Sequence, residues 1–330
     1  MLRRALLGLI AIGTVIAAVA WLVRFQPFGP AGPLGSPLPG SHPALAGWRP
    51  GVSAPFARLE MATAAHDGRI WLAGGLEPDG NATAAMSIFD PAAAAWSGGP
   101  PLPQQLHHAA LVSTGEQLVV IGGYLGSTGE PVDEVWVLEP DGQSWQPGPP
   151  LPDPRGAGAA AYDGSRIVYA GGVGPRGVQA DVFALADGAW TRIGQLGRPR
   201  EHLAAAVDSA GRVWFMGGRQ GGLDRNVGDV EVASADGIQP MAMVTPRGGV
   251  AAFFAPGVGV CLTGGETPPF ALPTVECVDE TGRIVALPNM GQRRHGHGAA
   301  VVDGVAYALL GGEVPGLSAS STIEVLALGS

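Results

Sequence analysis

Residues 118–123, Leu118-Val119-Val120-Ile121-Gly122-Gly123, form an apolar run that ends in a Gly-Gly pair. Such a run occurs six times, and successive pairs are 48, 49, 46, 47 and 47 residues apart. Self-similarity at a period of about 40–50 residues is typical of repeat arrays, and for strand-forming repeats it predicts a β-propeller. The six pairs are Gly74-Gly75, Gly122-Gly123, Gly171-Gly172, Gly217-Gly218, Gly264-Gly265 and Gly311-Gly312.

Each repeat contains further signals in the same order. A strand of small residues, as in 157–161, leads through a polar turn into the apolar run, and a third strand follows, as in 182–185. The apolar runs do not alternate with polar residues, which is typical of strands covered on both faces. Neighbouring blades of a propeller would supply that cover.

A Trp marks the expected outer strand at Trp96, Trp145 and Trp190, and a Pro-rich turn leads from Trp145 to Arg155. This order of signals resembles the kelch repeat, and the resemblance covers about residues 45–330. It implies an all-β, six-bladed kelch-type β-propeller. It leaves the function open, because kelch propellers serve both as enzymes and as binding platforms.

The two ends of the repeat region are expected to meet in one blade. The sixth repeat stops after its third strand, whereas Trp48, followed by Pro50, Pro55 and Arg58, has the layout of a fourth strand. We therefore expect an N-terminal outer strand within 46–57 to complete the sixth blade and to close the circle. Closure of this kind removes exposed sheet edges.

The N-terminal region contains an uncharged apolar run, residues 5–23, with Arg3 and Arg4 before it and Arg24 after it. A run of about 17–25 apolar residues can cross a bilayer as a helix, and the larger positive charge before it predicts a cytoplasmic N-terminus. The alternative is a signal peptide cleaved near Ala20, followed by secretion. Both interpretations place the propeller outside the cytoplasm, in the periplasm or at the cell surface. The expected segments are a single-pass anchor of the cytoplasmic membrane or signal peptide (1–24), a Pro- and Gly-rich linker (25–45) and the propeller (46–330).

The charge of the chain disfavours one class of partner. Its 28 acidic and 19 basic residues give a formal net charge of −9. Adjacent basic residues occur only at Arg3-Arg4 and Arg293-Arg294, so there is no basic block to follow a phosphate backbone. We expect no nucleic-acid partner.

The chain has two cysteines, Cys261 and Cys277, and both lie in the fifth repeat. A hairpin centred near Pro269 sets them opposite each other, at a Cα separation of about 4.5–5.5 Å that a disulfide can span. The expected oxidising compartment favours this bond. Two buried, unlinked thiols are the alternative.

One long polar residue precedes each Gly-Gly pair by 16 or 17 positions. The loops that hold these residues and the loops after the pairs open on the same face, so we expect the six to surround the central channel. Arginine clusters suit carboxylate, sulfate or phosphate ligands. The alternative is that these side chains bond loop carbonyls or acids within the fold. The candidate ligand-binding residues are Arg58, Gln105, Arg155, Arg200, Arg247 and Arg294.

Histidines also gather in these loops, and Glu201 and His202 beside Arg200 are candidate catalytic residues for acid–base chemistry. Clustered imidazoles can bind metal, and His295 and His297 have the most suitable spacing. However, His107 and His202 each lie two residues after the long polar residue of their repeat, and a repeat-consensus position explains both without a metal. We expect no metal and no cofactor. The loop histidines are His107, His108, His202, His295 and His297.

Two enzyme groups with kelch propellers can be compared with this chain. A copper site of the galactose oxidase type is disfavoured, because both cysteines lie on one hairpin. The chain is more similar to bacterial N-acetylneuraminate epimerases, which are secreted kelch propellers. We expect an extracytoplasmic recognition module that binds a protein or an anionic glycan through its loop face. The alternative is an epimerase or mutarotase acting on an acidic sugar such as N-acetylneuraminate.

Overall fold

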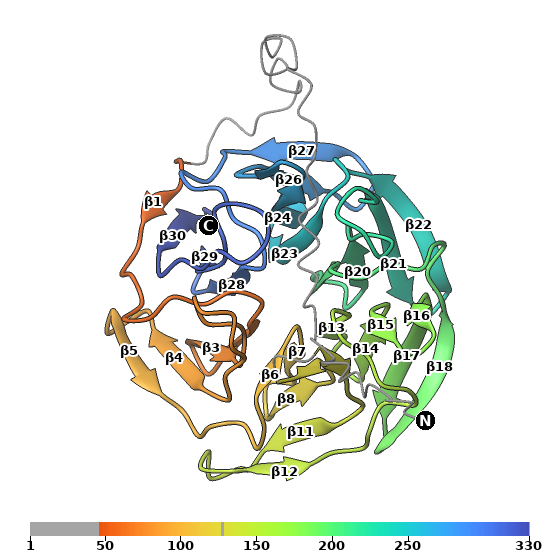
Figure 1. Cartoon of the computed structure of the whole chain (residues 1–330). Helices are drawn as coiled ribbons and strands as arrows, with labels where there is room; N and C mark the ends of the chain where they lie inside the picture. Colours follow the sequence, from red (N-terminus) through yellow and green to blue (C-terminus); the bar gives the residue numbers. More distant parts are fainter. Residues whose placement is uncertain (1–45, 127–128, 330) are drawn as a thin grey trace, which may run out of the picture. The chain divides into compact units, whose positions relative to one another are not determined.

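Six antiparallel sheets are arranged around a common centre (Figure 1). Each consists of four strands side by side, and one of them has a short fifth strand in addition. They belong to a computed structural model that describes residues 46–126 and 129–329. The described residues contain strands, turns and bends and no helix. The expected all-β class is therefore confirmed for this part of the chain, and the arrangement fits a β-propeller.

The innermost strand of each sheet lies beside the innermost strands of its two neighbours, and this series of contacts closes on itself. Small residues dominate these strands, as in Ala159-Ala160-Ala161, because the sheets come closest to one another near the centre. The innermost strands are β2 (Ala62–His66), β7 (Ala110–Ser113), β13 (Ala159–Tyr162), β19 (Ala204–Val207), β23 (Gly248–Ala255) and β28 (Gly298–Val302).

The second strand of each sheet contains the apolar run identified from the sequence. In β20, for example, Val213, Trp214, Phe215 and Met216 are all buried, because neighbouring sheets cover both faces of the strand. These strands supply much of the core between the sheets. They are β3 (Arg69–Ala73), β8 (Leu118–Ile121), β14 (Ile167–Ala170), β20 (Val213–Met216), β24 (Gly259–Thr267) and β29 (Val305–Leu309).

The third and fourth strands extend each sheet outward. The Ile238 and Ile284 segments, where the Trp signal is missing, still form outer strands. The third strands are β4 (Met86–Asp90), β11 (Val135–Leu138), β17 (Asp181–Ala186), β21 (Asp229–Ser234), β26 (Val275–Val278) and β30 (Ile323–Ala327). The fourth strands are β5 (Ala95–Gly98), β12 (Trp145–Pro147), β18 (Ala189–Gln195), β22 (Gly237–Met243), β27 (Ile284–Leu287) and β1 (Arg49–Pro50).

The N-terminal strand β1 completes the sheet formed by the last repeat. Arg49 pairs with Val325 of β30, and the indole Nε1 of Trp48 donates to the carbonyl oxygen of Pro288 at 3.0 Å. The described chain therefore has the pairing between its first and last strands that the layout around Trp48 predicts.

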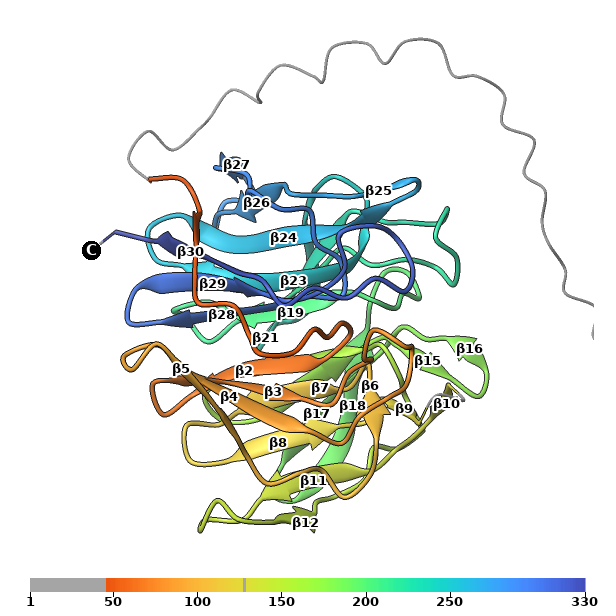
Figure 2. The same cartoon turned by 60° about the vertical axis from the view of Figure 1, so that its left-hand side comes forward.

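Short strands lie in the loops that follow the Gly-Gly pairs and in the loop that leads into β7. Figure 2 shows β10, β16 and β25 together at one end of the sheets. The backbone of this region forms the loop face. These strands are β6 (Leu106–His107), β9 (Tyr124–Leu125), β10 (Glu130–Pro131), β15 (Val173–Gly174), β16 (Gly177–Val178) and β25 (Phe270–Ala271).

The first five Gly-Gly pairs occupy one repeated backbone position, where a side chain would collide with the next repeat. A Cβ on Gly122 would lie 2.4 Å from the carbonyl oxygen of Arg155. The sixth pair is displaced by one residue: the N–H of Gly311 donates to the carbonyl oxygen of Arg58, as Gly123 does to Arg155. Leu310 thus takes the first position, with a φ of 59°. The sequence alignment of Gly311-Gly312 with the other pairs was therefore wrong by one residue.

The predicted anchor or signal peptide and the predicted linker lie outside the described residues. Across residues 46–126 and 129–329, no helix has the length and apolar character that crossing a bilayer requires.

Candidate functional site

Six residues, one from each repeat, form a closed ring of backbone hydrogen bonds at the centre. Each residue donates its N–H to the carbonyl oxygen of the corresponding residue in the preceding repeat, over 2.7–3.0 Å. The bond from Glu60 to Gly296 joins the first repeat to the last. All six have a φ between 52° and 64°, a conformation that normally favours glycine. We call this set the inner ring: Glu60, His108, Ala157, His202, Gly249 and Gly296.

The inner ring corrects the sequence alignment of the second repeat. The carbonyl oxygen of Leu106 accepts the N–H of Gly75, as that of Arg155 accepts the N–H of Gly123. Leu106, not Gln105, is therefore equivalent to the five arginines. By the same shift, His108 rather than His107 corresponds to His202. The two repeats differ by one residue in this loop, which spacing alone could not locate.

The five arginines are buried within the sheets rather than exposed at the mouth of a channel. Arg200 Nη1 donates to Glu231 Oε2 at 2.7 Å, and its Nη2 donates to the carbonyl oxygen of Phe215 at 3.2 Å. Arg247 and Arg294 make the corresponding contacts with Glu276 and Glu324. These contacts favour the structural alternative over the ligand-binding role.

The remaining two arginines have different partners. Arg155 lies 3.4 Å from Asp181 and 3.5 Å from Asp153. Arg58 donates to Ser87 Oγ over 3.4 Å and lies over the ring of Phe56. Among residues 46–126 and 129–329, no carboxylate oxygen lies within 4 Å of the Arg58 guanidinium, and Arg58 is only 4% exposed. A ligand-binding role for these arginines stays a prediction.

Three polar side chains of the inner ring lie close together. One potential ligand atom each from Glu60, His108 and His202 lies within 4.8 Å of the other two. His108 Nε2 is 3.3 Å from Glu60 Oε2, and the rings of His108 and His202 have centroids 4.6 Å apart in an edge-on arrangement. With Gly249 and Gly296, they line a cavity of about 100 Å³.

The glycines of the inner ring make room for this cluster. A Cβ on Gly296 would lie 2.4 Å from Glu60 Oε1 and 2.6 Å from its Cδ. A side chain at position 296 would therefore displace the Glu60 carboxyl group. The inner ring therefore combines three polar residues with three small ones, and Gly249 and Gly296 are neighbours in it.

A second layer of charges surrounds the cluster. Arg219, the first residue after the fourth Gly-Gly pair, bridges two carboxylates: its Nε is 2.9 Å from Glu201 Oε1 and its Nη1 is 2.6 Å from Glu266 Oε1. Glu201 also contacts the Nδ1 atom of His202. The two catalytic candidates are thus adjacent and buried, and both belong to a network that includes Arg219.

Burial perturbs the protonation of the central cluster. It raises the pKa of Glu60, although the nearby charges of His295 and Arg219 oppose this shift. It lowers the pKa of His108 to about 3, helped by Arg219 and His295, and holds the pKa of His202 well below its usual range. At neutral pH both imidazoles are therefore neutral and each has one nitrogen able to accept a proton or a metal.

The other three loop histidines contact different groups within the protein. His295 places its two ring nitrogens 3.0 Å from the carbonyl oxygens of Gly312 and Gly316, and His297 Nε2 lies 2.8 Å from Thr263 Oγ1. The spacing of His295 and His297 therefore does not produce a shared site. His107 contacts His108 through the Nδ1 atoms of the two rings.

A disulfide joins β24 to β26. Cys261 and Cys277 are opposite each other in the register of these strands, and their sulfur atoms are bonded. Both residues are fully buried in the core between the fifth and sixth sheets. The bond lies within the scaffold, away from the central cluster.

One comparison identifies a known repeat in the chain. Residues 105–152 match the family model of the Kelch motif. This match, together with the all-strand, multi-sheet architecture, fits a kelch-repeat β-propeller. No curated protein matches the chain.

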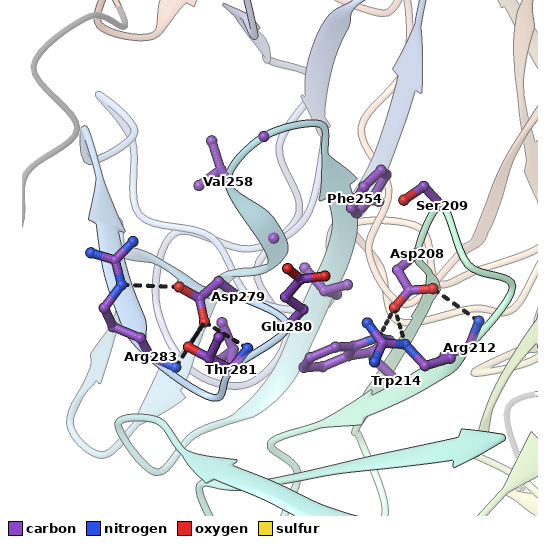
Figure 3. A pocket seen from close by; sticks show the side chains of 14 residues that line it. Asp208, Ser209, Arg212, Trp214, Phe254, Val258, Asp279, Glu280, Thr281 and Arg283 are labelled. Atoms are coloured by element: carbon purple, nitrogen blue, oxygen red, sulfur yellow. Dashed lines mark hydrogen bonds and ion pairs between the residues drawn. The ribbon is translucent and has the colours of Figure 1, made fainter.

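A larger cavity, of about 330 Å³, lies among hairpin turns of the fourth and fifth sheets (Figure 3). Its acidic residues already have internal partners. Asp208 accepts bonds from Trp214 Nε1 at 2.8 Å and Arg212 Nε at 2.7 Å, and Asp279 accepts from Thr281 and Arg283. Although burial acts to raise the pKa of Asp208, these donors lower it overall. The carboxylates stabilise turns, so this cavity is a weaker candidate than the centre.

The sequence identified some members of the central site and missed others. Glu201 and His202 were singled out, whereas His108 was named only among the loop histidines and Glu60 was not a candidate. Glu60, His108 and His202 each lie two residues after the repeated position that holds Arg58, Leu106 and Arg200. That signal was present in the sequence, but the one-residue difference at Gln105 and Leu106 concealed it.

Proposed function

We propose that this protein is a recognition module that binds a protein partner through the loop face. The observation that carries this proposal is the distribution of exposed apolar side chains. Leu223 is 40% exposed, Phe270 54%, Val314 59% and Leu317 69%. All four lie in segments that follow the last three Gly-Gly pairs, on the loop face, and exposed apolar side chains on one face are typical of protein interaction sites.

The loop of the first repeat lies next to this group. A Cβ on Gly80 would be 3.3 Å from Leu317 Cδ1, so the loop containing Gly80 borders the apolar side chains. Charged residues are close to them in the sequence, as Arg225 is to Leu223 and Glu313 is to Val314. An apolar centre with a polar rim is the usual anatomy of a protein interface. The kelch repeat itself suggests a protein-interaction propeller.

We further propose that the scaffold is a closed propeller with six blades. The closed inner ring, the closed series of contacts between innermost strands and the pairing of β1 with β30 support this count. A closed ring would hold the six loop sets at fixed positions. A rigid scaffold of this kind lowers the entropy cost of binding a partner.

We place the propeller outside the cytoplasm, either anchored by residues 5–23 or secreted. The apolar run in the sequence supports this location. The Cys261–Cys277 disulfide supports it independently, because disulfides persist mainly in oxidising compartments. The partner would then be an extracytoplasmic protein.

Affinity capture with two matched charge substitutions tests the proposal. Val314 on the loop face and Met243 on the outer strand β22 are both 59% exposed. Proteins cross-linked in intact cells to full-length wild type should also be recovered with M243E and be lost with V314E. Equal recovery with both variants, or recovery of no specific protein by wild type, would contradict the proposal. Recovery of a glycan in place of a protein would also contradict it.

A second candidate function is acid–base catalysis on an acidic sugar. The perturbed pKa values of Glu60, His108 and His202 favour it, because such shifts concentrate at functional sites. The central cavity of about 100 Å³ is small beside the ~300–1,000 Å³ typical of ligand pockets. An anomer-exchange assay with N-acetylneuraminate tests it. Turnover that E201Q abolishes would support this function, and absence of turnover in wild type would exclude it.

A further inference from the structure

We propose that Glu60, His108 and His202 bind one divalent transition-metal ion of the zinc class at the centre of the inner ring. Two imidazoles and one carboxylate are a common set of protein ligands for such ions. Their candidate ligand atoms already lie within 4.8 Å of one another. This inference does not depend on the proposed protein-binding face.

The backbone fixes the positions from which these three side chains extend. Each ligand residue belongs to the inner ring and is held by hydrogen bonds on both sides; His108, for example, donates to Glu60 and accepts from Ala157, both at 2.9 Å. The three residues therefore converge from separate sheets on a rigid frame. Preorganisation of this kind is what a metal site requires of its scaffold.

Each histidine has a neighbour that orients its ring. Glu201 contacts Nδ1 of His202, and His107 contacts Nδ1 of His108. These contacts leave Nε2 on each ring for a metal, and His108 Nε2 already faces the Glu60 carboxylate at 3.3 Å. A carboxylate on the distal nitrogen of a ligating histidine is a recurrent feature of zinc sites. Glu201 is therefore assigned as a positioning residue.

The local charge also suits a dication. Glu60, Glu201 and Glu266 are three carboxylates, and Arg219 is the guanidinium that pairs with the last two. When all three are ionised, two negative charges remain, and one divalent ion would neutralise them. Buried charges that lack compensation are costly, so a bound ion would relieve this excess.

The surrounding space is sufficient for an ion and little else. The cavity lined by these residues has a volume of about 100 Å³, which can hold an ion with one or two water ligands. Gly249 and Gly296, which lie between His202 and Glu60 in the ring, leave that side of the cavity without side chains. An open coordination position would face that side.

Binding of Zn²⁺ and Co²⁺ to the full-length, metal-stripped protein in mild detergent tests the proposal. Wild type should bind one equivalent of either ion, and Co²⁺ should give visible absorption bands. H108Q, H202Q and E60Q should each lose the bands and the tight binding. E201Q should bind roughly 10–100-fold more weakly. H66Q is the matched control, because His66 lies at a hairpin end beside Ser113, and it should bind like wild type.

A second measurement keeps the test independent of how the variants fold. X-ray absorption of the wild-type Zn²⁺ complex should show two imidazole ligands and oxygen ligands, with no sulfur. Absence of imidazole scattering would overturn the proposal. So would binding by H108Q and H202Q that matches wild type, or an equal loss in H66Q.

Discussion

The backbone N–H of Glu60 donates a 2.7 Å hydrogen bond to the carbonyl oxygen of Gly296. This contact joins the first repeat to the last at the centre of the molecule, while the pairing of β1 with β30 joins them at the rim. The same residue, Glu60, contributes a side chain to the central polar cluster. Closure of the ring and assembly of the candidate site therefore depend on the same backbone.

Replacement of Gly296 by Ala should destabilise the protein more than replacement of Gly304. Both glycines have a positive φ, 53° and 72°, which costs an L-residue about 1–2 kcal/mol. Only at Gly296 would the new Cβ also meet the Glu60 carboxyl group, at 2.4 Å. Urea unfolding should show a larger loss for G296A than for G304A. Equal losses would mean that the Glu60 carboxyl group is not held against Gly296.

Removal of the charge of Glu231 should be strongly destabilising. In E231Q the guanidinium of Arg200 stays buried and loses its carboxylate partner at 2.7 Å, and breaking a buried pair costs about 3–5 kcal/mol. Denaturant unfolding measures this loss. R283Q is the control: Arg283 pairs with Asp279 but is 72% exposed, so its replacement should change the unfolding free energy far less. A similar effect of both substitutions would contradict the structural role of the buried arginines.

Loss of the disulfide should lower stability without affecting the central cluster. Cys261 and Cys277 are 16 residues apart in the sequence, and a bond closing a loop of that size contributes about 3 kcal/mol. The double variant C261A/C277A should unfold at lower urea concentration than oxidised wild type. A reductant should destabilise wild type and leave the double variant unchanged. If reductant does not affect wild type, the bond does not form in the protein.

The unfolding free energy of the metal-free protein should fall as the pH drops below neutrality. Burial lowers the pKa of His108 to about 3, whereas the unfolded chain has the usual value of about 6.5. Between these values the unfolded state binds more protons, so acid favours unfolding. From pH 6.5 to pH 5 the loss for this residue is about 1.6 kcal/mol. H108Q should show a shallower pH dependence than wild type, and identical slopes would contradict the burial of a neutral His108.

The sequence predicted the fold better than it predicted the site. The even spacing of the Gly-Gly pairs predicted the repeated sheets. The segment around Trp48, which precedes the first repeat, predicted the pairing of β1 with β30. These signals are local and repeat in every unit. Residues 1–45 lie outside the described part of the chain, so the anchor and the linker stay predictions.

The arginines show why the site was harder to predict. Their spacing placed them in equivalent positions, but it could not show that Glu231, Glu276 and Glu324 lie beside them. These acids are on third strands, about 30 residues later in the chain, and no local pattern connects the two sets. The direction of a loop side chain depends on the backbone of neighbouring repeats. The positive φ of Glu60, His108 and His202 could not be predicted from the sequence either, because non-glycine residues rarely adopt this conformation.

The most direct test of the proposed recognition function is site-specific photo-cross-linking in the cells that make the protein. A photoreactive amino acid would replace Leu317 on the loop face, which is 69% exposed, or Met243 on β22, which is 59% exposed. We expect one discrete protein adduct from position 317 and none from position 243. Equal adducts from both positions, an adduct from position 243 alone, or no adduct from position 317 would contradict it.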